Sequence, residues 1–495
     1  MIYLHRKYPE NTGQEGNAYL TVCAALCIAV ILSLCLTLIE GAARNGVRLE
    51  AECVTDIGLN SIMAEYHREL MKQYNLFAVD ASYGTGVCGK TNTESHLRHY
   101  VEKNLDYKDV FLSNYLYGDF LAIRLDQCEL TRVNILTDRG GAVFRRYAAE
   151  AMRSDTGLEL LEQLQEWMRT VEVNGLEEGG QEAEKDRLDR EIEEYDGMEV
   201  EVEKDQWEAL EVVNPTGALE QKKKLGILKL VTEDETGLSC NVLDIDSLVG
   251  NRIKNGQVNQ GSILQQELSG PEKLAERFLF QEYLLKYMGR YGKENQENTL
   301  RYQVEYLIAG KDSDVENLKS VVNRICIIRE AANVMHLLAD EVKHNEARAA
   351  AALVCTLVFL PELTALLETA IILGWAYAES IYDVKSLLSG GKVPLLKDAG
   401  SWHYDLTSAL YGDLTDGTEE GKGLSYEDHL RILLMFTDED IITARAMDMV
   451  EADIRSTPGN AAFRLDGCYT ELEARLQFSG FRGYSCEITR RKKYR

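Results

Sequence analysis

The segment from residue 84 to residue 91 carries the most specific chemical pattern in the chain. Its sequence, GTGVCGKT, has the spacing of a phosphate-binding P-loop. The defining positions are Gly84, Gly89, Lys90 and Thr91. In a P-loop the backbone amides surround phosphate at a helix start, the lysine balances its charge, and the threonine hydroxyl binds magnesium. Nucleotide binding is therefore one candidate chemistry.

The surrounding sequence favours a different interpretation of this segment. P-loop enzymes need a mostly parallel sheet built from repeated strand-helix units, and the sequence contains no such repeat. Neither ILTD, ending at Asp138, nor NVLD, ending at Asp244, forms a long apolar strand for a magnesium-binding aspartate. We interpret the segment as a glycine-rich surface loop, with nucleotide binding as the alternative.

A second candidate site consists of His336, Asp340 and His344. These residues are four apart, so a continuous helix would place them on one face, where they could hold a divalent metal. A polar stripe on an amphipathic helix explains the same spacing. His96 and His99, with Glu94, could form another such group, but we favour a solvated helix end as their position.

Other patterns that are typical of enzymes are missing from the sequence. The chain contains no G-x-S-x-G motif and no C-x-x-C pair. With 81 acidic residues against 54 basic ones, paired carboxylates occur throughout and none can be singled out. The net charge of -27 would repel phosphate backbones and anionic headgroups, which argues against a nucleic-acid partner. We expect no cofactor and no enzymatic activity.

The segment from Tyr19 to Ile39 predicts a transmembrane helix. It contains no charged residue, and its length suits the ~20 residues that a helix needs to cross a bilayer. The large side chains of this membrane anchor are Tyr19, Leu20, Val22, Leu26, Ile28, Val30, Ile31, Leu32, Leu34, Leu36, Leu38 and Ile39. The run exceeds the core of a usual signal peptide, although residues 41–43 could imitate a cleavage site.

The orientation of the anchor is inferred from the short tail that precedes it. Basic residues are nearly balanced on the two sides, so charge does not decide the topology. Only 18 residues precede the anchor and more than 450 follow it. We expect the tail in the cytoplasm and the bulk of this single-pass protein outside, where nucleotide is scarce. A secreted protein with a cleaved leader is the alternative.

The helical pattern continues beyond the anchor. Apolar residues recur at steps of mostly three or four, and no proline interrupts them. These residues are Val47, Ala51, Val54, Ile57, Ile62, Tyr66 and Leu70. The pattern predicts one long helix from about Tyr19 to Tyr74, in which an apolar half precedes an amphipathic half, as in the stalk of a pilin or pseudopilin.

Two segments carry a resemblance to a known family. The first, LIEGAARNGVRLEAECVTDIGLNSIMAEYHRELMKQYNLFAVDASYG, begins at the end of the anchor, and the second runs from Phe359 to Lys397. They resemble a family of uncharacterised membrane proteins of Gram-positive bacteria that is associated with tight-adherence pilus genes. The resemblance implies an accessory of a type IV-like pilus or secretion system, with other proteins of that system and the lipid bilayer as partners. It implies no catalytic residues.

One position departs from the pattern of processed pilins. Such proteins are cut after a glycine that is followed five positions later by glutamate, whereas Thr21 stands five positions after Gly16. We therefore expect a permanently anchored accessory protein and not a polymerising major pilin.

The remaining sequence predicts a predominantly helical α+β fold. We divide the chain into a tail (1–18), the anchor (19–40), the stalk helix with a first extracytoplasmic lobe (41–171), an acidic and flexible insertion (172–270), and a helical lobe (271–495). Within the last part, the apolar run 349–377 predicts a buried helical hairpin whose second helix begins at Pro361. A further membrane span is the alternative interpretation of that run.

The C-terminal part carries local signals for helix starts and for a hairpin. Ser425 with Asp428, and Thr437 with Asp440, have the spacing of capping boxes. Apolar residues alternate over 472–478 and again over 484–488, with glycines between, which predicts a β-hairpin. The basic tail RRKKYR is interpreted as a charged strand edge, with a contact to an anionic polymer as the alternative.

Overall fold

The computed structural model describes most of the chain. The described ranges are 14–106, 120–153, 158–177, 179–203, 206–209, 214–232, 235–262, 270–294, 298–357, 363–412, 414–415 and 421–494. Most of the expected cytoplasmic tail and the expected helix start at Pro361 lie outside these ranges.

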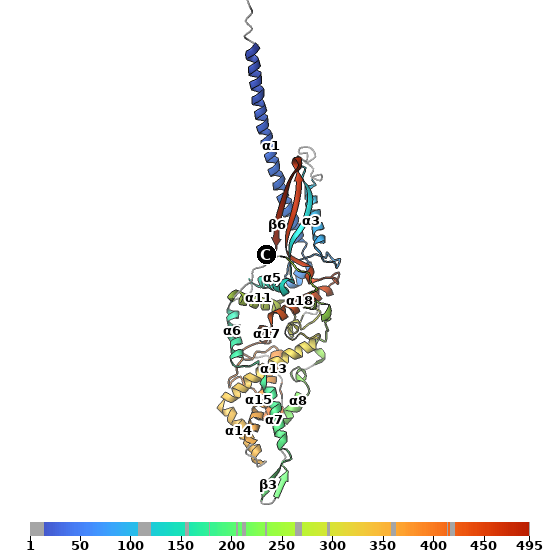
Figure 1. Cartoon of the computed structure of the whole chain (residues 1–495). Coiled ribbons are helices and arrows are strands. Elements are labelled where there is room, and N and C mark those ends of the chain that lie inside the picture. The colour runs from blue at the N-terminus through green and yellow to red at the C-terminus, as the bar shows by residue number, and fades with distance from the viewer. Residues whose placement is uncertain are drawn as a thin grey trace, which may run out of the picture.

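The molecule is elongated, and its first helix projects from one end (Figure 1). A small antiparallel sheet lies beside the inner half of helix α1, a helical lobe follows, and the short hairpin of β3 (Glu199–Glu203) and β4 (Gln206–Ala209) lies at the opposite end. The predicted α+β, predominantly helical class is confirmed.

Helix α1 runs from Gln14 to Ala64 as one helix of 51 residues. The predicted continuation to Tyr74 is wrong, because the chain breaks after Ala64 and restarts as α2 (Arg68–Tyr74). Tyr66 instead pairs with Val79 as an isolated β-bridge, and the His67 imidazole accepts a hydrogen bond from the Leu70 amide at the start of α2. Pairing with a distant segment therefore ends the helix, without help from a proline or glycine.

The sheet brings together strands from both ends of the chain. β5 (Cys468–Gly480) is central and pairs with β2 (Arg124–Ile135) on one side. On its other side it pairs with the short β1 (Val79–Asp80) and then with β6 (Tyr484–Lys493), all antiparallel. The predicted C-terminal hairpin is thus confirmed as β5–β6, with inward-facing residues of β5 fully buried.

The helical lobe contains most of the remaining chain. Its longer helices are α5 (Asp138–Met152), α6 (Leu158–Val173), α7 (Gly180–Tyr195), α11 (Pro271–Tyr287), α13 (Asp314–Ala339), α14 (Glu341–Leu357), α15 (Thr364–Leu388), α17 (Tyr426–Phe436) and α18 (Glu439–Ser456). Its shorter helices are α8 (Gly217–Lys223), α9 (Ile227–Val231), α10 (Val249–Lys254), α12 (Gln303–Ala309) and α16 (Leu406–Tyr411). Helix α3 (Lys90–Leu105) packs instead against α1 and β2.

The predicted helical hairpin in the apolar run is formed by α14 and α15, which pack against each other. Nearly every residue of α15 from Ala370 to Ile381 is buried by protein. Within the described ranges, the only helix long and apolar enough to cross a membrane is the N-terminal one. The hydrophobic character of α15 is therefore that of a core helix.

The segment expected to be a flexible insertion contains ordered elements. Helices α7 to α10 lie within it, and apolar side chains of these helices, such as Leu188, Leu219 and Val249, are buried in the core of the helical lobe. The described parts of this segment therefore include packed helices, which the expectation of an acidic and flexible insertion did not contain. Its short apolar islands, such as LGILKLV, supply the buried contacts.

The two predicted capping boxes have different outcomes. At Ser425 the reciprocal hydrogen bonds with Asp428 are present, so the start of α17 is confirmed. At Thr437 the prediction is wrong, because Thr437 ends α17 and Asp438 caps α18 by accepting hydrogen bonds from the amides of Asp440 and Ile441. No residue separates Thr437, the C-cap of α17, from Asp438, the N-cap of α18.

Buried apolar side chains form two clusters. The smaller one joins the second half of α1 with α3 and the sheet, and the larger one fills the helical lobe. The first and last parts of the chain thus share a core. The boundaries drawn at residues 171 and 270 stay predictions.

Candidate functional site

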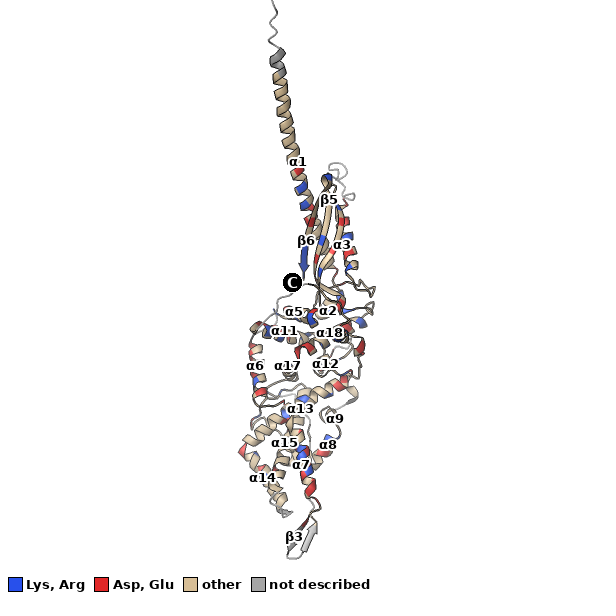
Figure 2. Cartoon of the chain, viewed as in Figure 1, with Lys and Arg blue, Asp and Glu red and all other residues tan. Residues whose placement is uncertain are grey.

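The first half of α1 is exposed on all sides. The twelve large side chains of the predicted anchor, from Tyr19 to Ile39, are 50–79% exposed. Figure 2 shows no charged residue on this part of the helix, and charges begin where it meets the sheet. Its length and mean hydropathy are sufficient to span a membrane. In water, so large an apolar surface would be costly, whereas lipid would cover it.

The second half of α1 is fixed to the sheet and to α3. Val47, Ala51 and Ile62 are fully buried there. A Cβ atom at Gly58 would lie 2.9 Å from the Val101 side chain, and one at Gly480 would lie 2.9 Å from the Val47 side chain. Both glycines therefore let neighbouring elements approach closely. The exposed and the docked halves belong to one helix, so the position of the sheet follows that of the anchor.

Ion pairs between β6 and α1 add to this attachment. The Arg490 guanidinium lies 3.2 Å from a carboxylate oxygen of Glu52, and the Lys492 ammonium lies 3.5 Å from Asp56. The Tyr494 hydroxyl donates a hydrogen bond to the Met63 carbonyl. The basic tail thus contacts the stalk, a partner that the sequence interpretation did not consider.

The P-loop-like segment has a strand, a loop and a helix in the expected order. Gly84 has a φ of +80°, Gly89 caps α3, and Lys90 and Thr91 begin that helix. The preceding strand, however, belongs to an antiparallel sheet. The Asp80 carboxylate accepts hydrogen bonds at 2.8 Å from the backbone amide and the hydroxyl of Ser82. Two amides of the segment itself already donate within the protein, Gly84 to the Ser82 hydroxyl at 3.2 Å and Thr85 to the Ser82 carbonyl at 2.9 Å, which disfavours phosphate there.

The three residues of the metal candidate do not form a common site. Helix α13 ends at Ala339, so Asp340 lies between two helices and bonds to Lys343 at 3.3 Å. His344 pairs with Glu368 at 2.9 Å, while the His336 Nε2 atom remains 3.8 Å from Asp340. Among the described residues, no group of three metal-binding side chains is placed to hold an ion.

The second histidine group, His96 and His99 with Glu94, does not form a common site either. His96 lies 3.2 Å from Glu65 and stacks on Tyr83, whereas Glu94 accepts a hydrogen bond from the Leu130 amide. Each of these side chains serves a contact between elements. They do not converge on a shared cavity.

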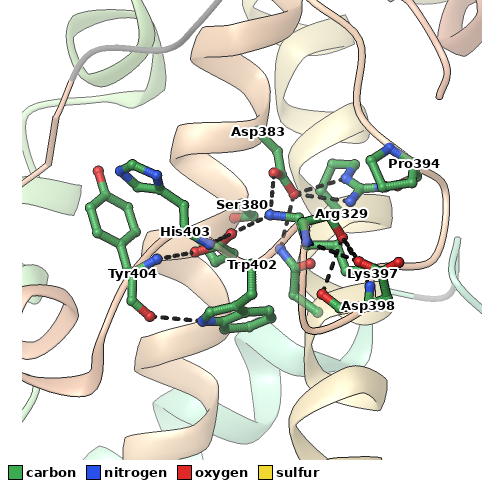
Figure 3. A network of polar contacts seen from close by, with 12 residues as sticks. Arg329, Ser380, Asp383, Pro394, Lys397, Asp398, Trp402, His403 and Tyr404 are labelled. Atoms are coloured by element: carbon green, nitrogen blue, oxygen red, sulfur yellow. Dashed lines mark hydrogen bonds and ion pairs between the residues drawn. The ribbon is translucent and has the colours of Figure 1, made fainter. Parts of the chain in front are cut away.

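A buried ionic network joins α13, α15 and the loop that follows α15 (Figure 3). The Arg329 guanidinium lies 3.0 Å from Asp383 and donates hydrogen bonds at 2.8 Å to the carbonyls of Pro394 and Leu395. The Lys397 ammonium lies 2.6 Å from Asp383 and also bonds Glu379. The four charged side chains are 0–1% exposed.

The Glu379 carboxylate extends the network to the far end of the same loop. It accepts hydrogen bonds from the backbone amides of His403 and Tyr404 at 2.8 and 2.9 Å. Two acids therefore face two bases with their main acceptors and donors satisfied. This chemistry suits a clamp that holds the loop, because it leaves no reactive group free.

Sequence reasoning missed this network. Glu379 and Asp383 are four residues apart in an apolar helix, and Lys397 ends the second segment of the family resemblance. Two acidic residues on one face of a mostly apolar helix could have indicated a buried ionic network, since buried carboxylates need partners. The partners themselves come from distant positions and could not be identified from spacing.

Comparison with known families gives one match. Residues 205–480 match the model of a family of unknown function, DUF5702, which covers more than half of the chain. The chain belongs to this family. The DUF5702 match runs from β4 to the end of β5, so it includes the ionic network and the second resembling segment, Phe359–Lys397. Helix α1 and strand β6 lie outside it. No curated protein and no solved structure matches the chain.

Proposed function

We propose that this protein is a non-enzymatic, membrane-anchored accessory component of a bacterial tight-adherence pilus or a related type IV-like secretion system. It acts through protein-protein contacts, and its bulk lies outside the cytoplasm. The observation that carries the proposal is helix α1, whose apolar half is exposed and whose second half is packed into the sheet.

The pilus association rests on sequence. The segment after the anchor resembles a family that accompanies tight-adherence pilus genes, and the long helix with an apolar first half is the arrangement of a pilin stalk. Thr21 stands where a processed pilin would carry glutamate. A protein that keeps its anchor and assists assembly fits these features better than a subunit of the fibre.

Contacts with other proteins are supported by the surface of the helical lobe. Leu338, Val342 and Leu353, at the end of α13 and along α14, are 53–68% exposed. Large exposed apolar side chains are typical of protein interfaces when they lie close together. The alternative function, a nucleotide- or metal-dependent enzyme, has less support, because the Gly84 and Thr85 amides already donate to Ser82 and the histidines have other partners.

Site-specific photo-crosslinking in native membranes tests the proposal. A photoreactive residue would replace Ile31 in the anchor or Val342 in the lobe, and Lys72, whose side chain is 76% exposed on α2, provides the control position. We expect pilin-like or assembly-platform proteins to be captured from the first two positions and not from the third. Capture at neither position would overturn the proposal.

A further inference from the structure

A cavity of about 510 Å³ lies between the central segment of the chain and the core helices of the lobe. Helices α7 to α9 form one wall, through residues such as Gln181 and Lys223, and α13 and α15 form the other, through Glu330 and Tyr377. Small-molecule sites occur preferentially in such seams between substructures. Neither the P-loop-like segment nor the network of Figure 3 contributes to this cavity.

Glu330 lines the cavity and has no direct partner. It is 7% exposed, and within the described ranges neither a hydrogen bond nor an ion pair reaches its carboxylate. Burial, as the largest cause, raises the pKa of Glu330 to about 7. Buried carboxylates in proteins are normally paired or hydrogen-bonded, so an unpartnered one facing a cavity points to a missing donor.

The two neighbouring lysines form ion pairs with carboxylates other than that of Glu330. The Lys223 ammonium lies 3.0 Å from Glu182, and the buried Lys185 pairs with Glu220. Both ammonium groups also lie over the Tyr377 ring, at 5.3 and 5.7 Å from its centroid. With Glu330 ionised, three carboxylates face these two ammonium groups, and neither ammonium group pairs with Glu330.

The remaining lining defines the chemistry of the missing group. The Gln181 side-chain oxygen is buried and accepts no hydrogen bond from the described residues, so it is a second acceptor without a donor. Ile227, Cys326 and Ile327 supply apolar walls. The charged groups on the rim, Lys311, Lys319 and Glu316, are exposed. Acceptors inside apolar walls suit an ammonium group on an alkyl chain.

We propose that this cavity binds a primary alkylammonium group, with Glu330 as its counter-ion and the Gln181 oxygen as a second acceptor. A divalent metal ion is a poorer fit, because the described residues offer no group of three ligands for it. The ammonium could belong to a free alkylamine or to the lysine side chain of a peptide. The inference does not depend on the proposed role at a pilus.

Calorimetric titration of the full chain in detergent micelles tests this proposal. The probes are cadaverine, Nα-acetyl-lysine amide and the uncharged Nα-acetyl-norleucine amide. We expect saturable binding of at least one amine and no binding of the norleucine derivative. Tighter binding of the lysine derivative would assign the site to a peptide side chain, and tighter binding of cadaverine to a free amine.

Two variants and one control test whether the amine binds in this cavity. Glu330→Gln should weaken amine binding by about tenfold or more, because a charge-assisted hydrogen bond is lost. Glu346→Gln removes the same charge at an exposed position of α14 outside the cavity and should leave the affinity unchanged. Gln181→Leu, at a partly exposed position, should weaken binding and remains informative if Glu330→Gln does not fold. Absence of amine binding, or unchanged affinity in Glu330→Gln, would overturn the proposal.

Discussion

Arg490 in strand β6 lies 3.2 Å from Glu52 in the second half of helix α1, so these two elements are in direct ionic contact. The Arg490 side chain is 37% exposed and that of Glu52 is 30% exposed, which makes this a partly screened surface pair. The pair is important because of the two elements that it connects. The pair joins strand β6 to the part of α1 that emerges from the predicted membrane anchor.

Charge reversal tests this contact. Arg490→Glu should lower the unfolding temperature of the detergent-solubilised chain slightly, because it places like charges side by side. Adding Glu52→Arg should restore part of the loss, with a coupling free energy of about 0.5 kcal/mol as for other exposed pairs. Thermal unfolding of the two single variants and the double variant measures this coupling. Strict additivity would show that the contact contributes nothing.

Gly480 tests the close approach of the sheet to α1. A Cβ atom there would lie 2.9 Å from a Val47 methyl group and 3.0 Å from the Leu121 carbonyl oxygen. Gly480→Ala should therefore destabilise the chain by roughly 1–3 kcal/mol through overpacking. Gly217→Ala is the control, since a Cβ atom at Gly217 meets nothing within 4 Å. Equal unfolding midpoints for the two variants in urea would contradict the described packing.

Lys397 tests the ionic network. Lys397→Met would leave Asp383 and Glu379 with one cation fewer in a fully buried environment. Removing one partner of a buried ion pair typically costs about 3–5 kcal/mol. Lys392→Met, at an exposed position in the same loop, should have little effect. Urea unfolding followed by tryptophan fluorescence is suitable because Trp402 lies beside the network (Figure 3). A stable Lys397→Met variant would show that the clamp is dispensable.

The pH dependence of stability can be traced to individual buried groups. Burial raises the pKa of Glu305 to about 7 from an ordinary value of 4.5, although its carboxylate accepts hydrogen bonds from the Tyr291 amide and the Tyr426 hydroxyl. The folded chain therefore keeps a proton that the unfolded chain releases. Stability contributed by this group is complete below pH 4.5 and falls as the pH rises to about 7, by at most ~1.4 kcal/mol per pH unit.

Glu305→Gln should reduce the slope of stability between pH 5 and 7, to which buried Glu330 also contributes, whereas Glu346→Gln, at an exposed position, should preserve it. His429 acts in the opposite sense. Burial lowers its pKa to about 4 from 6.5, so stability is lost as the pH falls from 6.5 towards 4. Urea midpoints at several pH values measure both effects. An unchanged slope in Glu305→Gln would contradict the assignment.

Nucleotide binding at the P-loop-like segment is expected to be absent. Magnesium ATP should leave the unfolding temperature of the chain unchanged, because the Gly84 and Thr85 amides of this segment already donate to Ser82. Lys90→Ala should not alter this result. A rise in unfolding temperature with ATP that is lost in Lys90→Ala would instead support the enzyme alternative.

Local patterns predicted the elements that are defined by neighbouring residues. The alternation around Leu472 to Phe478 and the glycines after it were sufficient for the C-terminal hairpin, since both strands are adjacent in sequence. The same holds for the cap at Ser425. These features depend on spacing within about 20 residues.

Features that depend on distant contacts were not predicted. The ionic network joins Arg329 to a loop more than 60 residues away. The cavity at Glu330 likewise needs α7 and α13 to meet. No spacing rule contains this information, because it arises only when the helices pack.

The predicted topology, with the helical lobe outside the cytoplasm, can be tested by labelling a natural cysteine. Cys240 is exposed on the helical lobe, whereas Cys326 is buried and serves as the internal control. Wall-free cells would be treated with a membrane-impermeant maleimide, and the Cys240 peptide would be followed by mass spectrometry. We predict that Cys240 is labelled in intact cells and Cys326 only after denaturation. Labelling of Cys240 only after lysis would place the lobe in the cytoplasm and contradict the predicted topology.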